Sequence, residues 1–230
     1  MFWNMQARGV GEFVLASSAD VTVSVSNDQI TFTPVADTMG ASLLFYPGAL
    51  VDPVAYAPMA RAVAEAGYPV VIVETPYRSA PLDRHRAELF KRTQALIAAD
   101  TSGRAWIIGG HSKGGKLAAL FARDHAPLID GLLLVGTSHP REDDLSSLRL
   151  DVTKVFGSND GLASEAEVRQ FASNLPPSTH WERIEGGNHR QFGYYGWQLG
   201  DGTALISRDE QQAHLLAAVL RQLERVHARR

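Results

Sequence analysis

Short apolar runs alternate with amphipathic helical patterns along most of this chain of 230 residues. The runs stay apolar at successive positions, which is typical of strands buried on both faces of a parallel sheet. Strands are predicted at residues 41–46, 69–74, 105–109, 132–135, 152–156 and 180–184, and helices at 53–66, 83–99, 113–124, 164–174 and 208–226. Alternation of this kind predicts an α/β fold, a mostly parallel central sheet with helices on both faces.

The beginning of the chain follows a different pattern. Two β-rich stretches, 21–25 and 29–33, flank the turn formers Asn27 and Asp28, which predicts an antiparallel hairpin. We find no internal repeat, low-complexity segment or linker. The sequence therefore predicts one domain over residues 1–230, with an N-terminal extension at 1–20 and a core at 21–230.

Composition excludes several classes of protein. There is no cysteine, so thiol nucleophiles, disulfides and thiolate metal sites are absent. A net charge of -3 with scattered basic residues gives no reason to expect nucleic acid or an anionic membrane as partner. No apolar run reaches the length of a membrane span, and the first residues lack the pattern of a signal peptide. We expect a cytoplasmic protein.

The pattern G-x-S-x-G occurs at Gly110, Ser112 and Gly114, after one predicted strand and before a predicted helix. This context is that of a nucleophile elbow, a tight turn that projects a serine hydroxyl above the strand ends. Side chains at the two glycines would collide with the neighbouring strand or helix. Ser112 is therefore the expected nucleophile.

A serine nucleophile needs a base, and the base needs an orienting carboxylate. Asp160 lies in the polar loop after the strand 152–156, and His189 ends the loop after 180–184. The order serine, aspartate, histidine is the order in which this type of fold supplies them. Other residues that compete for these two roles are the carboxylates Asp143 and Asp144 and the imidazoles of His111 and His139.

Two backbone N–H groups are expected to form an oxyanion hole. One is that of Lys113, directly after the nucleophile, and the other that of Ala49 in the loop after 41–46, with Leu50 as the alternative. The residues predicted to line the substrate pocket are Gly48, Leu50, Phe192 and Tyr194.

Four segments together resemble the α/β-hydrolase superfamily, and within it the small lidless bacterial hydrolases near the dienelactone hydrolases. These segments are Phe45-Tyr46-Pro47-Gly48, residues 110–115, residues 157–161 and Gly186-Gly187-Asn188-His189. The resemblance implies a Ser-Asp-His triad at Ser112, Asp160 and His189. Dienelactone hydrolases use a cysteine nucleophile, which this chain lacks, so an ester or related acyl substrate is favoured. The segment 138–150, where larger members insert a lid, is short.

The sequence thus predicts a carboxylesterase-like serine hydrolase that cleaves a small-molecule ester through an acyl-enzyme. Such a reaction needs no metal or organic cofactor. An acyltransferase with the same triad, in which an alcohol replaces water, is one alternative. A non-catalytic binding protein of the same fold is the other, because fold alone does not determine function.

Overall fold

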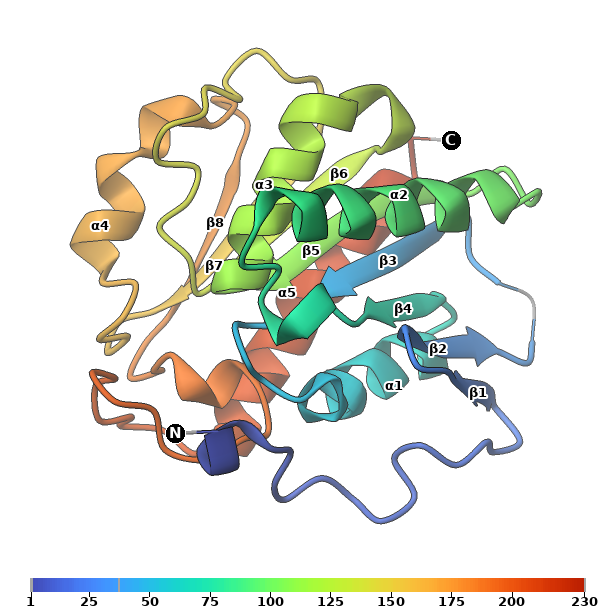
Figure 1. Ribbon diagram of the computed structural model, residues 1–230, viewed down its shortest axis with the longest axis horizontal. Helices are drawn as coiled ribbons and strands as arrows, with labels where there is room; N and C mark the ends of the chain where they lie inside the picture. Colours follow the sequence, from blue (N-terminus) through green and yellow to red (C-terminus); the bar gives the residue numbers. More distant parts are fainter. Residues whose placement is uncertain (1, 37, 230) are drawn as a thin grey trace.

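The computed structural model describes residues 2–36 and 38–229. At its centre lies one eight-stranded sheet in the order β1-β2-β4-β3-β5-β6-β7-β8 (Figure 1). The strands are β1 (Val21–Val25), β2 (Gln29–Pro34), β3 (Ala41–Tyr46), β4 (Val70–Val73), β5 (Ala105–His111), β6 (Gly131–Val135), β7 (Asp151–Gly157) and β8 (His180–Ile184). Neighbours from β4 to β8 pair in parallel, whereas β1 and β2 form an antiparallel hairpin joined to β4. The predicted mixed sheet with its N-terminal hairpin is confirmed.

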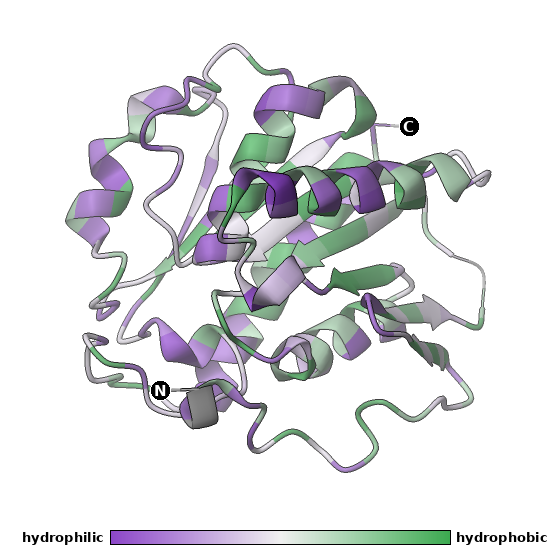
Figure 2. Cartoon of the chain, viewed as in Figure 1, coloured by the Kyte–Doolittle hydropathy of each residue, from purple (hydrophilic) through white to green (hydrophobic). Residues whose placement is uncertain are grey.

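Helices cover both faces of the sheet. They are α1 (Ala57–Glu65), α2 (Asp83–Ala99), α3 (Lys113–His125), α4 (Glu165–Gln170) and α5 (Arg208–His227). The β3 side chains alternate between the faces: Leu43 and Phe45 pack with residues of α1 and α5, and Leu44 with residues of α2 and α3. Figure 2 shows apolar central strands flanked by helices in which hydrophilic and hydrophobic residues alternate. Each face therefore has its own hydrophobic core.

Proline explains one difference from the sequence prediction. The helix expected at 53–66 is divided into a 3-10 turn, η2 (Pro53–Tyr56), followed by α1. Pro58 has no N–H and cannot donate to the carbonyl of residue 54, so the regular α-helical hydrogen bonds begin later in the chain. The Ala57 N–H instead closes a tighter turn onto Val54 O.

The segment expected to form one helix at 164–174 is also divided, into α4 and a short 3-10 turn, η5 (Ala172–Asn174). Its predicted start is confirmed. Ser164 accepts from the Glu167 N–H, and the Glu167 side chain accepts from the Ser164 N–H, which is a capping box. The link between β6 and β7 contains no helix or strand at its described residues 136–150, so the fold has no lid there.

The N-terminal segment packs on the core beside the loop that follows His189 (Figure 1). Ala7 forms a bridge with Tyr195, and Met5 O accepts from the Asp52 N–H at 2.8 Å. Arg61 of α1 donates to the carbonyls of Val14 and Phe13. The domain limits proposed from the sequence remain a prediction, and their end points, residues 1 and 230, lie outside the described residues. No helix within the described residues is long and apolar enough to span a membrane.

A lysine is buried within the sheet. Lys154 on β7 is 1% exposed, and its Nζ donates to His139 O at 2.6 Å. Among the described residues no carboxylate forms an ion pair with it. Burial, assisted by the charge of Arg141, lowers the pKa of the Lys154 ammonium to about 7.

This lowered pKa predicts a pH dependence of stability. The ordinary lysine pKa is 10.5, so between pH 7 and 10.5 the unfolded chain binds the proton that the folded chain has lost. The free energy of unfolding should therefore rise with pH in this window, by about 2 kcal/mol from pH 7 to pH 9. Urea unfolding at both pH values would measure it. Lys154→Met should lack this increment, and an equal increment in both proteins would contradict the prediction.

Candidate active site

The residues predicted for the triad and the oxyanion hole lie at the edge of the sheet where the parallel strands have their carboxyl ends. Residues 47–50 follow β3, Ser112 follows β5, Asp160 follows β7 and His189 follows β8. Because these four strands run in the same direction, their following loops meet at one edge. The sheet therefore brings together segments that are far apart in the sequence.

Ser112 occupies a strained turn between β5 and α3. Its backbone has φ 54° and ψ −116°, a region that residues with a Cβ rarely enter. Its N–H donates to Val135 O at 2.9 Å, and its carbonyl accepts from the Lys116 N–H at 3.1 Å. The side chain is half-buried. The turn has the conformation expected of a nucleophile elbow.

The two glycines of the motif permit close backbone contacts. A Cβ on Gly114 would lie 2.0 Å from Tyr46 O and 2.5 Å from Pro47 O. A Cβ on Gly110 would lie 2.4 Å from the carbonyl carbon of Gly114. All these neighbours are backbone atoms, which cannot give way. The collision expected from the sequence is confirmed at both positions.

Asp160 and His189 form a buried pair. His189 Nδ1 lies 2.8 Å from Asp160 Oδ2, and the two side chains are 1% and 0% exposed. The other carboxylate oxygen, Oδ1, accepts from the N–H groups of Leu162 at 2.8 Å and Ala163 at 2.7 Å. An ionised carboxylate only accepts, so we assign the imidazole proton to Nδ1. Nε2 is then left with its lone pair, and it is buried without a hydrogen-bond partner in the described structure.

A second aspartate, Asp201, holds the backbone at His189. Its Oδ1 accepts from the His189 N–H at 3.0 Å and its Oδ2 from the Arg190 N–H at 2.9 Å. Sequence reasoning missed Asp201. Its position in the turn Gly200-Asp201-Gly202 is a weak signal, because such turns are common without any role in a site.

The buried side chain of Gln211 on α5 also fixes this loop. Its Oε1 accepts from the Asn188 N–H at 2.9 Å, and its Nε2 donates to Asn188 O at 2.7 Å. Gln211 was missed as well. A glutamine on the inner face of an amphipathic helix was the available signal, since buried amides need partners.

Ser112 and His189 are not hydrogen-bonded to each other. Within the described residues, Ser112 Oγ forms no hydrogen bond. The imidazole that contacts His189 is that of His111, directly before Ser112, with ring centroids 4.5 Å apart. The structure thus joins Asp160 to His189 directly and connects the elbow to His189 through His111.

The candidate oxyanion donors differ in availability. The Leu50 N–H donates to Arg78 O at 2.6 Å and is therefore occupied. Ala49 N–H has no acceptor among the described residues, and Lys113 is the first residue of α3, where N–H groups lack an intrahelical partner. This favours Ala49 over Leu50 as the second donor.

The four predicted pocket residues do not share one location. Gly48 is buried against Tyr56 and His111, and the buried Phe192 ring lies 5.7 Å from the His111 ring. Leu50 is half-buried at the margin of the core on the α1 and α5 face. The side chain of Tyr194 instead reaches Asp209 on α5 and lines a cavity of about 280 Å³ with residues of α1 and α5. Ser112 and His189 do not line that cavity.

The alternative carboxylates have other partners. Asp143 forms an ion pair with Arg123, in the last turn of α3, far along the helix from Ser112. Asp144 accepts from the Ser146 N–H at 2.9 Å. Neither contacts His189 among the described interactions, in contrast to Asp160.

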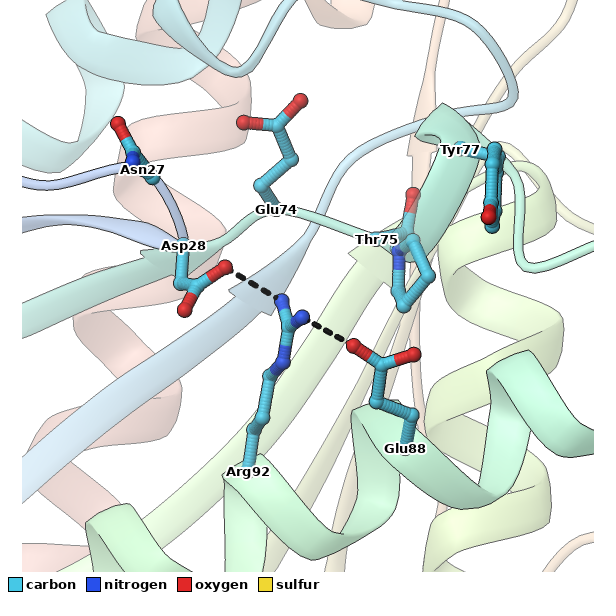
Figure 3. Close-up of a pocket in the computed structure, with 8 residues that line it drawn as sticks. Asn27, Asp28, Glu74, Thr75, Tyr77, Glu88 and Arg92 are labelled. Atoms are coloured by element: carbon cyan, nitrogen blue, oxygen red, sulfur yellow. Dashed lines mark hydrogen bonds and ion pairs between the residues drawn. The ribbon is translucent and has the colours of Figure 1, made fainter.

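Another cavity, of about 330 Å³, lies where β4 ends (Figure 3). Arg92 of α2 extends into it between two carboxylates, Asp28 at 2.8 Å and Glu88, and forms ion pairs with both. The remaining lining residues are Asn27, Glu74, Thr75, Pro76 and Tyr77. This cavity lies apart from the Asp160–His189 pair, which does not line it.

Comparison with known proteins gives one family and many similar folds. A profile of the Alpha/beta hydrolase family matches residues 42–213. No curated protein sequence matches the chain.

Three solved structures illustrate the similarity. A protein of Thermoplasma acidophilum, described as a predicted CIB-like hydrolase, is 17% identical with a TM-score of 0.62, covering 88% of this chain and 97% of its own. An α/β serine hydrolase without a lid from Xanthomonas campestris is 14% identical, TM-score 0.61, covering 90% and 97%. A candidate dienelactone hydrolase from Klebsiella pneumoniae is 12% identical, TM-score 0.60, covering 88% and 92%. At these identities the likeness concerns the fold, and it agrees with the resemblance found in the sequence.

The glycine contacts predict a sharp effect of one methyl group. Gly114→Ala should lower the free energy of unfolding by about 3 kcal/mol or more, because its Cβ meets the Tyr46 and Pro47 carbonyls. Gly11→Ala is the matched control, since a Cβ there meets no heavy atom within 4 Å. Thermal and urea unfolding of both variants would measure the difference. Equal stability of the two variants would show that the elbow tolerates a side chain.

Proposed function

Because the chain belongs to the alpha/beta hydrolase family, we propose that it is a serine hydrolase that cleaves esters with the triad Ser112, His189 and Asp160. Family membership supports a hydrolase. The buried hydrogen bond between His189 Nδ1 and Asp160 Oδ2, at 2.8 Å, is the observation that carries the more specific proposal. It leaves a basic nitrogen, Nε2, free at the edge of the sheet that also holds the serine turn.

In the first half of the reaction, Ser112 Oγ attacks the ester carbonyl carbon while its proton passes to His189 Nε2. The carbon–oxygen bond to the alcohol then breaks, and the same proton goes to the leaving oxygen. In the second half, water attacks the acyl-serine, its proton passes to Nε2, and the acid leaves as Ser112 Oγ regains a proton. The products are one acid and one alcohol for each ester and water consumed.

The lack of a hydrogen bond between Ser112 and His189 does not conflict with this sequence of steps. Hydrogen bonds between nucleophile and base are often long without substrate and shorten in the reacting complex. Nε2 has no competing partner within the described structure, so no hydrogen bond has to break before it accepts the serine proton.

Negative charge develops on the carbonyl oxygen during both attacks. The N–H groups of Lys113 and Ala49 are the proposed donors to this oxygen, and the dipole of α3 adds a favourable field at its first turn. A single donor of this kind is typically worth about 2.7–4 kcal/mol of transition-state stabilisation.

The first test removes the nucleophile. Ser112→Ala should reduce ester hydrolysis to background, because no other hydroxyl occupies the strained turn. Release of p-nitrophenol from esters of increasing acyl length would measure kcat/KM, with melting curves to establish that the fold is kept. Wild-type turnover in a folded variant would refute Ser112 as the nucleophile.

Covalent labelling separates an enzyme from a binding protein of the same fold. A fluorophosphonate probe should label the wild-type protein once, at Ser112, and should not label Ser112→Ala. A well-folded wild-type protein that remains unlabelled would favour the binding protein.

The second test concerns the orienting carboxylate. Asp160→Asn keeps Oδ1 as acceptor for the Leu162 and Ala163 N–H groups, so the loop should remain folded. Its new NH₂ group faces Nδ1 and donates, which moves the imidazole proton to Nε2 and removes the base. In a comparable triad this change cost about 10⁴ in kcat, and we expect a loss of similar order with little change in KM.

Matched controls are Asp143→Asn and Asp144→Asn, alone and combined. These carboxylates interact with Arg123 and with the Ser146 N–H, so their loss should change kcat only a few-fold. A larger loss in the controls than in Asp160→Asn would transfer the role to the earlier loop.

A further inference from the structure

The hydroxyl of Tyr56 joins two segments of the proposed site. Tyr56 ends η2, and its buried ring lies 5.2 Å from that of Phe45. Its Oη accepts from the Gly48 N–H at 3.0 Å and lies 2.8 Å from His111 Nδ1. Gly48 belongs to the loop that carries the proposed donor Ala49, and His111 precedes the nucleophile.

The direction of the second hydrogen bond follows from counting protons. The Gly48 N–H can only donate, so Oη uses one lone pair there and has a single proton to place. Within the described residues the only other partner of Oη is His111 Nδ1. A buried hydroxyl proton needs an acceptor, and Nδ1 is the acceptor within reach among the described residues, so the phenol donates to Nδ1. His111 then carries its own proton on Nε2. This nitrogen forms no hydrogen bond within the described structure, but the backbone of His189 lies close enough to the ring to favour a proton there.

His111 is also held neutral. The ring is fully buried, and burial together with the neighbouring His189 lowers its pKa well below the ordinary value, although the His189 backbone acts in the opposite direction. Its Nε2 edge lies against Gly136, whose φ of 50° and missing side chain leave room for the ring. His111 is thus fixed from both sides next to the proposed base.

We propose that Tyr56 is a positioning residue: its hydroxyl orients the Gly48–Ala49 peptide for the oxyanion and holds His111 as the neutral Nε2–H tautomer beside His189. This inference rests on the proposed function. Tyr56 touches neither the nucleophile nor the base and acts through Gly48 and His111.

Both effects are expected to favour the transition state over the bound substrate. The Gly48 N–H is anchored on Oη, which restricts rotation of the adjoining peptide whose N–H belongs to Ala49. His189 becomes positively charged as Ser112 attacks, with the His111 ring centroid 4.5 Å away. A neutral His111 avoids repulsion between two cations at that moment.

Tyr46, the last residue of β3, provides a matched control. It is equally buried, it directly precedes the loop Pro47-Gly48, and its Oη pairs with Thr93 Oγ1 of α2 at 2.6 Å. Tyr46→Phe removes the same chemical group from the same region without touching Gly48 or His111. Any general effect of losing a buried hydroxyl should appear in both variants.

The experiment compares Tyr56→Phe with Tyr46→Phe in two measurements, and a third measurement uses the wild-type protein. We expect Tyr56→Phe to lower kcat about 10- to 100-fold with KM within two-fold, less than the loss of a complete oxyanion donor. Affinity for a trifluoromethyl ketone, which forms an oxyanion adduct with the serine, should fall by the same factor. Tyr46→Phe should leave all three quantities within two-fold of wild type.

The third measurement needs no substrate. Long-range ¹H–¹⁵N spectra of the wild-type protein, with His111 assigned by its loss in His111→Gln, should show the Nε2–H tautomer. An Nδ1–H tautomer would overturn the proposal, and so would equal kinetic losses in the two tyrosine variants. The spectra require no catalytic activity and can also be recorded on Ser112→Ala. The tautomer of His111 is therefore decided even if the proposed function fails. The spectra also decide it if Tyr56→Phe does not fold.

Discussion

The first turn of α3 lies directly against the end of β3, and Gly114 is the residue that lets the two backbones meet. The Tyr46 and Pro47 carbonyls occupy the space where a Cβ of Gly114 would lie. This contact sets the start of the helix beside the loop that follows β3. It therefore brings the N–H of Lys113, the first residue of α3, to the loop that contains Ala49. Without this close approach the two proposed oxyanion donors would belong to separate parts of the molecule.

The strain at Ser112 is sustained by the same arrangement. A non-glycine residue at φ 54° costs on the order of 1–3 kcal/mol and persists only where its surroundings leave no alternative. Here the N–H is held by β6 through Val135 O, and the carbonyl is held by α3 through Lys116. Since β5 pairs with both β3 and β6 in the centre of the sheet, the turn cannot relax without disturbing those pairings.

Local patterns in the sequence predicted most of the elements and placed Asp160 and His189 in the loops where the structure finds them paired, because periodicity and strand–loop order are local properties. The bounds of α2, residues 83–99, and of β3, residues 41–46, agree with the prediction. The contributions of Tyr56, Asp201 and Gln211 were not predicted. Each acts through a hydrogen bond to a distant or irregular segment, such as Gln211 to Asn188, and apolar periodicity carries no information about such bonds. Tyr194 shows the converse: it follows His189 closely in sequence, yet its side chain reaches α5.

The position of the proposed base depends on the last part of the chain. His189 lies in a loop, and loops alone are poor at fixing a side chain to within a fraction of an ångström. Asp201 and Gln211 supply the missing rigidity, and both follow His189 in the sequence. Gln211 is in turn fixed because α5 is anchored at its other end, where Arg225 donates to the buried carboxylate of Asp151 at the start of β7. That same strand ends in the loop of Asp160. Asp160 and His189 are therefore both anchored on β7, Asp160 through its own loop and His189 through Gln211 and α5. This explains how two loops can hold a 2.8 Å hydrogen bond between them.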